Sequence, residues 1–356
     1  MHYELSANAK SFKTVPKGTT ELVISRNKNI VSLEGLPNTI TTLSCQNCDE
    51  LTSLKGIPNS VVVLYLQWCD RLDSLEGIPN SVTRLNIQWC SSLKNLNHIP
   101  DSVTDLNCSG CAYLKSFVLP NSVTTLSFDY LSFDLSVTPN SITELECKST
   151  KITSLEGLPN SITKLKCSCK SLTSLIGLPN SVSVLEIENC ALSKFDGMPD
   201  SIQELSLKGD IRSLKGLPNS IRKLTCKWLT ASSLEGIPDS VEELVLYMCK
   251  NLNTLKGVKD GLVTLICNKC VGLISMEGIP NSVRELDCHS CSNITLKGMP
   301  RNLTKLNLSG CRSIVPSLRL ALIKELTHDL KIDFKRSIFR LKLSMIKTGY
   351  KETRLN

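Results

Sequence analysis

The sequence contains few of the residues that enzyme sites need and no stretch suited to crossing a membrane. Only four histidines occur among 356 residues, and none completes a recognisable Ser/His/Asp or Cys/His arrangement. No glycine-rich phosphate loop is present, and aromatic residues make up only 4% of the chain. No apolar run approaches the roughly 20 residues of a membrane helix. We therefore expect a protein that is not an enzyme, with no catalytic residues, no cofactor and no membrane span.

The sequence also starts without a basic region followed by an apolar stretch, which is the pattern of a secretory signal peptide. We therefore expect no signal peptide and a cytoplasmic location. Charge is unevenly placed: residues 312–356 hold 11 of the 41 Lys and Arg but 4 of the 33 Asp and Glu. This end of the chain carries most of the net charge of +8. The rest of the chain is close to neutral.

A short repeat fills most of the chain. The phrase Ile/Leu-Pro-Asn/Asp-Ser-Val/Ile returns about every 20 residues, with prolines on this grid from Pro16 to Pro300. Lys259 stands in the one grid position that lacks proline, which gives fifteen repeats of 19–21 residues. Leucine occupies the sixth position after the proline in every repeat. Such a period is the sequence signature of a solenoid.

Each repeat predicts one strand and a short return. Around the sixth-position leucine, apolar and exposed positions alternate, as in residues 63–67, which is strand periodicity. The return contains Gly, which tolerates positive φ, and Pro-Asn/Asp-Ser, whose side chains we expect to bond to local backbone. Only about ten residues remain for the return, so we expect extended chain or short 3₁₀ turns there rather than a helix.

The repeat, written (I/V)xxLx(C/L/I)xxCxxL, resembles the leucine-rich repeat over roughly residues 14–314. The phrase Pro-Asn-Ser-Ile-Thr-x-Leu is also similar to the FNIP repeat of amoebae and their large DNA viruses, although the Phe-Asn-x-Pro half of that motif is absent. The resemblance implies a right-handed leucine-rich-repeat solenoid with a parallel β-sheet on its concave face and a mostly extended or 3₁₀ convex side. We expect residues 1–13 to form an N-terminal cap. We expect residues 315–356 to form a basic, amphipathic helical C-terminal cap.

Seventeen cysteines raise the question of a metal site or of disulfides. Cys267, Cys270, Cys288 and Cys291 form two C-x₂-C pairs whose spacing matches a zinc site. However, sixteen of the cysteines stand eight or eleven residues after the proline position of their repeat, which Lys259 occupies in one case, and the eighth position also accepts Leu and Ile. A position that accepts all three residues is typical of core packing, where free Cys acts as a small hydrophobe. We therefore expect reduced, metal-free cysteines, with zinc and disulfides as the alternatives.

The outward strand positions and their ends supply the candidate binding residues. All three tryptophans stand ten residues after a proline, and two of them lie in consecutive repeats. Trp and Tyr are over-represented in interface hot spots. The alternative is that these rings only cover the sheet edge. The candidate site residues, with their neighbours, are Tyr65, Gln67, Trp68, Gln88, Trp89, Tyr130, Trp228 and Met248. A mixed Lys and Glu field follows on later strands and is typical of a solvated surface.

These observations predict a protein–protein interaction scaffold, expected to be a monomer, that binds an unknown protein partner on its concave face. The resemblance also suggests a second function, a substrate-recognition subunit of a ubiquitin-ligase complex. The basic tail suggests a third, binding to nucleic acid or to a membrane surface. We regard nucleic acid as the less favoured partner, because a capping helix with a solvated outer face also accounts for the basic tail.

Overall fold

The computed structural model describes residues 1–115, 118–129, 135–148, 151–192, 194–195 and 197–314. The helical cap predicted for residues 315–356 therefore lies outside the described residues. The chain divides into two compact units. The N-terminal unit comprises residues 1–171 and 177–181, and the C-terminal unit comprises residues 172–176 and those from 182 onward.

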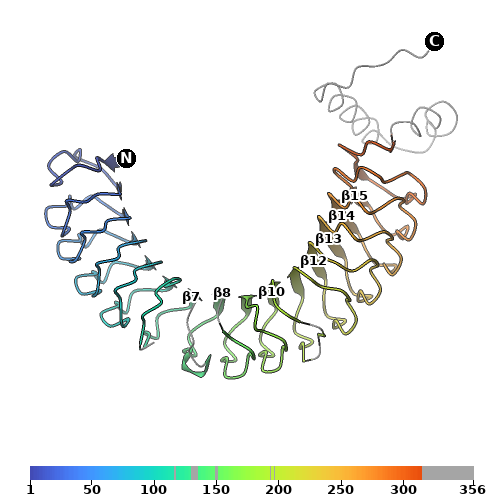
Figure 1. Cartoon of the computed structure of the whole chain (residues 1–356), viewed down its shortest axis with the longest axis horizontal. Helices are drawn as coiled ribbons and strands as arrows, with labels where there is room; N and C mark the ends of the chain where they lie inside the picture. Colours follow the sequence, from blue (N-terminus) through green and yellow to red (C-terminus); the bar gives the residue numbers. More distant parts are fainter. Residues whose placement is uncertain (116–117, 130–134, 149–150, 193, 196, 315–356) are drawn as a thin grey trace, which may run out of the picture. The chain divides into compact units, whose positions relative to one another are not determined.

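The described residues form sixteen strands that follow one another in chain order, with parallel pairing. The N-terminal unit holds β1 (His2–Leu5), β2 (Glu21–Ser25), β3 (Thr42–Gln46), β4 (Val63–Tyr65), β5 (Arg84–Asn86), β6 (Asp105–Asn107), β7 (Thr125–Asp129), β8 (Glu144–Lys148) and β9 (Lys164–Ser168). The C-terminal unit holds β10 (Val184–Glu188), β11 (Glu204–Lys208), β12 (Lys223–Lys227), β13 (Glu243–Tyr247), β14 (Thr264–Asn268), β15 (Glu285–Asp287) and β16 (Lys305–Asn307). Within each unit the strands line the concave side and the returns lie on the opposite side (Figure 1).

The repeated leucine sets the register of the sheet. Leu43 pairs with Leu64 across β3 and β4, and Leu224 pairs with Leu244 across β12 and β13. These side chains are fully buried, whereas the residues on either side of each leucine are only partly buried, except Ser44, which is buried. Each repeat thus buries its apolar face against its neighbours, which is how a solenoid builds a core. The predicted alternation of buried and outward positions is confirmed.

The returns are made of turns and extended chain, as predicted. The backbone N–H of Ile40 donates to the carbonyl of Pro37, and the same four-residue turn recurs at most of the prolines. The glycines two residues before the prolines have positive φ, and His98 takes the same conformation at φ 66° in place of glycine. Among the described residues the one helix is the 3₁₀ turn η1 (Leu135–Val137). No helix in this part of the chain is long and apolar enough to span a membrane.

The serine that follows Pro-Asn/Asp acts between repeats, which differs from the local bonding expected from the sequence. Its hydroxyl donates to a buried-position carbonyl of the preceding repeat, 2.7 Å away. These pairs are Ser60 to Ile40, Ser81 to Val61, Ser102 to Val82, Ser161 to Ile142, Ser181 to Ile162, Ser201 to Val182 and Ser240 to Ile221. The turn residues favour a short return, but the repeats stack so closely that backbone carbonyls of the preceding repeat also lie within reach of the serine hydroxyl.

The first residues of the chain extend the sheet. Strand β1 pairs with β2, and Phe12 is buried. Asn27, which replaces Cys in the first repeat, is fully buried and donates its side-chain amide to the carbonyls of Ser6 and Ala9. Its Oδ1 accepts from the N–H groups of Asn29 and Ile30. One buried amide therefore satisfies four backbone groups and ties residues 1–13 to the first repeat.

Candidate functional site

The tenth position after the proline, which carries the three tryptophans, has an unusual backbone. Nine non-glycine residues in this column have φ between 52° and 61°: Arg26, Asn47, Trp68, Trp89, Asn189, Trp228, Met248, Lys269 and Ser290. Glycine occupies the same position, also at positive φ, as Gly110, Gly209 and Gly310. Left-handed backbone is unfavourable for residues with a bulky side chain. The chain therefore keeps large side chains in a column that glycine would fit without strain.

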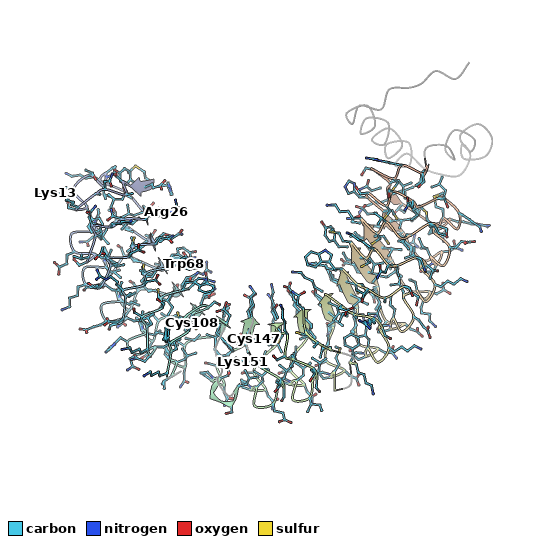
Figure 2. All side chains as sticks on the ribbon, in the orientation of Figure 1. Lys13, Arg26, Trp68, Cys108, Cys147 and Lys151 are labelled. Atoms are coloured by element: carbon cyan, nitrogen blue, oxygen red, sulfur yellow. The ribbon has the colours of Figure 1, made fainter. Side chains whose placement is uncertain are left out.

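Trp68 and Trp89 form a stacked pair in the N-terminal unit. Their ring centroids are 4.8 Å apart and their planes differ by 7°, which matches the spacing of about 5 Å expected for neighbouring strands. Trp68 is 45% exposed and Trp89 is partly buried. A Cβ on Gly110 would lie 2.4 Å from the Trp89 ring, so Trp89 fits between Trp68 and a glycine of the next repeat. Figure 2 shows Trp68 on the strand side of this unit and Lys13 on the other side.

Most hydrogen-bonding groups near this pair are uncharged. The uncharged outward and edge residues of β3 to β6, with those that follow these strands, are Ser44, Gln46, Tyr65, Gln67, Asn86, Gln88, Asn107 and Ser109. The first outward positions of β5 and β6 hold Arg84 and Asp105, which form an ion pair with each other at 3.9 Å. The Gln88 Oε1 accepts from Gln67 Nε2 at 3.4 Å and from Asn86 Nδ2 at 3.3 Å. Tyr65, Gln67 and Gln88 are partly buried, and Gln67 and Gln88 directly precede Trp68 and Trp89 in the chain. The structure thus brings five of the candidate residues into one surface, which we call the Trp68–Trp89 surface.

Trp228 and Met248 belong to the C-terminal unit and form a separate contact. The indole N–H of Trp228 donates to the Met248 sulfur at 3.4 Å, and the Lys208 ammonium lies 4.9 Å from the Trp228 ring centroid. Trp228 is 46% exposed. The candidate residues are therefore divided between two patches of different chemistry. Tyr130, the remaining candidate, lies outside the described residues.

The mixed Lys and Glu field forms ion pairs between neighbouring strands. Lys164 lies 3.5 Å from Glu144, and Lys148 and Lys166 both contact Glu146, at 2.8 and 3.3 Å. Burial opposes ionisation of Glu146, but hydrogen bonds to the two lysines and their charges outweigh it and lower the pKa of that carboxyl. These pairs satisfy one another, as expected of a solvated surface, and leave little charge for a partner.

The cysteines form an internal hydrogen-bonded column rather than a reactive site. All seventeen are buried and unbridged. Eleventh-position thiols donate to the eighth-position carbonyl of the preceding repeat at 2.6–3.7 Å, as from Cys90 to Leu66 and from Cys291 to Cys267. Burial raises the pKa of the Cys69 and Cys111 thiols to about 12. Within the described residues, no group of three His, Cys, Asp or Glu side chains is arranged to hold a metal ion.

The hydrogen bonds of this column give a reason for cysteine at the eleventh position that was not predicted from the sequence. The eleventh position was interpreted as packing alone, yet its thiols also donate hydrogen bonds to backbone carbonyls of the preceding repeat. Asn27 occupies this position in the first repeat and is also a donor. The substitution of Cys by Asn was the one clue in the sequence to a hydrogen-bonding role.

Comparison with known proteins finds similar solved structures only. No protein-family model matches the chain, and no curated protein matches it. Three solved structures are similar: CroV588, described as a novel circular leucine-rich-repeat protein, YopM from Yersinia enterocolitica, and the functional domain of InlJ from Listeria monocytogenes, described as including a cysteine ladder. Their identities are 22%, 19% and 17%, with TM-scores of 0.44, 0.42 and 0.37.

These matches cover 82%, 87% and 82% of this chain and 60%, 82% and 62% of the other chains. The chain therefore spans less than two thirds of CroV588 and of the InlJ domain. At this level of identity the likeness concerns the fold alone. The parallel strands in chain order and the buried leucine column are what make the fold a leucine-rich-repeat solenoid.

Proposed function

We propose that this leucine-rich-repeat solenoid is a non-enzymatic protein–protein interaction scaffold whose partner docks on the Trp68–Trp89 surface. The observation that carries the proposal is the stacked pair of tryptophans, exposed at Trp68 and partly buried at Trp89, on the strand side of the N-terminal unit. Rigid aromatic side chains surrounded by hydrogen-bonding groups are typical of interface hot spots. The partner itself would be recognised by ring contacts and neutral hydrogen bonds.

The backbone supports this proposal independently of the rings' exposure. Trp68 and Trp89 have φ of 60° and 61°, in a column where Gly110 shows that the fold accepts glycine. Residues held in sparsely populated backbone conformations cluster at binding and active sites. Stacking on Gly110 and on each other holds the two rings in one arrangement before a partner arrives, which lowers the entropy lost on binding.

The first prediction concerns the double variant Trp68→Ala and Trp89→Ala. Ala keeps the same backbone preference as Trp, so the change removes the rings with little effect on the core. We expect partner affinity to fall about thirtyfold or more, since aromatic anchors contribute about 2 kcal/mol or more each. The melting temperature should shift by no more than about 4 °C. The measurement is affinity purification with mass spectrometry, followed by titration of the recovered partner.

The matched control is Tyr113→Ala, which removes an aromatic ring that is 67% exposed but lies off the tryptophan column. This variant should recover the partner as well as the wild-type chain does. Unchanged recovery by the double variant would remove this surface as the site, and a large fall in its melting temperature would show that the rings belong to the core. Recovery of ubiquitin-ligase components as the Trp-dependent partner would favour the substrate-recognition role over a simple scaffold.

A second prediction concerns the basic tail, which we propose to be a cap. Leu306 of strand β16 and Leu308, which follows the strand, are both buried, and the terminal repeat of a solenoid needs cover for its open core edge. Deleting residues 316–356 should therefore cause aggregation and lower the melting temperature. A truncated chain that stays monodisperse and equally stable, but loses binding to RNA or to anionic vesicles, would instead assign the tail to those ligands.

A further inference from the structure

A second surface lies in the C-terminal unit, at the ends of β11 to β13, and the sequence reading did not separate it from the first. The pairing of strands places Lys208 beside Lys227 and Lys227 beside Tyr247. Trp228 follows Lys227, and the backbone N–H of Trp228 donates to the backbone carbonyl of Tyr247 at 2.9 Å. Lysine and aromatic side chains therefore alternate along one edge of the sheet, which we call the Lys–Trp228 surface.

This surface contains a hollow large enough for one apolar side chain of a partner. The hollow has a volume of about 370 Å³ and is lined by Trp228, Leu229, Thr230, Met248, Lys250 and Asn251. Trp228 and Met248 form one wall and are fixed to each other by the indole N–H and the thioether sulfur, 3.4 Å apart. The apolar wall and floor favour an aliphatic or aromatic anchor.

The charge around the hollow is positive. Within the described residues, neither Lys227 nor Lys250 nor Lys269 has an acidic partner, although the Lys269 ammonium donates to the Tyr247 hydroxyl at 3.2 Å. Lys208 is paired with Glu188 at 3.2 Å. Thr230, which lines the hollow, donates from its Oγ1 to Asp210 at 2.6 Å, and Asp210 is itself paired with Arg212. Three ammonium groups therefore face solvent without compensation.

Each of the two aromatic rings of this surface has a lysine ammonium group over one face. The Lys208 ammonium lies 4.9 Å from the Trp228 centroid, and the Lys269 ammonium lies 5.4 Å from the Tyr247 centroid. Single-stranded nucleic acid binds where bases can stack on free rings. Here each ring already has an ammonium over one face, so the surface suits carboxylates next to an apolar side chain better than it suits bases.

We propose that the Lys–Trp228 surface binds an acidic peptide segment that places one apolar side chain in the hollow and neighbouring Asp or Glu carboxylates on Lys227, Lys250 and Lys269. This site does not depend on the Trp68–Trp89 surface, whose neighbouring groups are mostly uncharged and whose Arg84 and Asp105 are paired with each other. Charge complementarity of this kind speeds association and fixes the register of the partner. Ammonium groups at an exposed rim make the affinity sensitive to ionic strength.

The test is selection of displayed random peptides on the immobilised full-length chain, with affinities measured by fluorescence anisotropy of the enriched peptides. We expect enriched sequences to hold a large apolar residue flanked by Asp or Glu. Their affinity should fall at least about tenfold with Trp228→Ala and at least about tenfold with the double reversal Lys227→Glu and Lys250→Glu. It should also fall as salt is raised.

The control for net charge is Lys55→Glu with Lys256→Glu, which reverses two exposed lysines in the returns, away from this surface. This control should bind the selected peptides as the wild-type chain does, and so should Trp68→Ala with Trp89→Ala. Enrichment of neutral or basic peptides, or acidic peptides that bind equally well to the Lys227 and Lys250 reversal, would overturn the proposal. The proposal would also be overturned if oligouridine bound tightly, if the same reversal abolished that binding, and if no selected peptide depended on Trp228.

Discussion

Replacing Gly56 with alanine should destabilise the chain by about 3 kcal/mol or more, whereas the same change at Gly35 should cost only about 1–2 kcal/mol. Both glycines stand two residues before a proline, and their φ values are 92° and 89°. The backbone strain that alanine would introduce is therefore the same at the two positions. Any difference between them has to come from the surroundings of the new methyl group.

Those surroundings differ sharply. A Cβ on Gly56 would lie 2.4 Å from the Glu34 Cα and 2.5 Å from the Glu34 nitrogen, both backbone atoms of the preceding repeat. A Cβ on Gly35 would have no heavy atom within 4 Å. Backbone atoms cannot rotate away as a flexible side chain can, so Gly56→Ala has to push two repeats apart. Overpacking of this kind typically costs a further 1–3 kcal/mol and occasionally more.

The measurement is urea unfolding of the two single variants and of the wild-type chain, with circular dichroism as the probe of unfolding. Gly177→Ala gives a second test, because its Cβ would lie 2.3 Å from the backbone nitrogen of Glu156. Gly177 and Gly56 variants should therefore group together, well below Gly35→Ala. Equal destabilisation at Gly35 and Gly56 would mean that the repeats separate easily at the returns, and that close stacking contributes little to stability.

The fold could be predicted from the sequence because every repeat has the same pattern of apolar residues around its strand. The sixth position is leucine in every repeat, and successive side chains of a strand point to opposite faces of the sheet. The face that carries the leucines therefore had to become the core. Fifteen repeats in register left no other way to bury those leucines than to stack the strands. The short return ruled out a helix by length, and the turns seen after Pro37 and at His98 agree with that.

The partners of the polar side chains could not be predicted in the same way. The hydroxyl of Ser60 was expected to bond within its own turn, but it donates to Ile40 in the preceding repeat. The Cys90 thiol likewise donates to Leu66. A sequence repeat states which residue types recur but not the distance between successive turns, and that distance decides whether a side chain reaches its own backbone or the next. Only Asn27, where Cys gives way to a stronger donor, hinted at this.

The candidate site was predictable in part. Equal position in consecutive repeats was enough to place Trp68 against Trp89, since neighbouring strands lie about 4.8 Å apart. The positive φ of that column was hidden, because glycine marks it in only three repeats. The sequence also grouped Trp228 with the other two rings by position, yet the lysines over and beside it, above all Lys208 and Lys227, give it a different chemistry.

Raising the pH above about 9 should unfold the protein steeply, and the cause should be its buried thiols. Burial raises the pKa of Cys69, Cys111 and Cys311 to about 12, and it raises the pKa of Cys45 and Cys108 well above the usual value. In the unfolded chain a thiol titrates near 8.5. The folded state therefore holds protons that the unfolded state releases.

The direction of the effect follows from this difference. Below about pH 8.5 the thiols are protonated in both states, and their contribution to stability is fully present. Between about pH 8.5 and 12 the unfolded chain loses protons while the folded chain keeps them, so the free energy of unfolding falls as the pH rises. At pH 10 each thiol such as Cys69 would account for about 2 kcal/mol, so several together exceed the usual stability of about 5–15 kcal/mol.

The measurement is the free energy of unfolding in urea from pH 8 to pH 10, under reducing conditions, for wild type and for Cys226→Leu. Leu207 and Leu246 flank Cys226 in register and are buried in the same column, so leucine is a residue that this column accepts. Removing one buried thiol should reduce the slope by about 1.4 kcal/mol per pH unit. Leu246→Ile, which changes the same column without changing the number of thiols, should leave the slope as it is in the wild type. A wild-type stability that stays level up to pH 10 would show that water reaches the thiols in the folded chain, and the column would then be open to metals and oxidants after all.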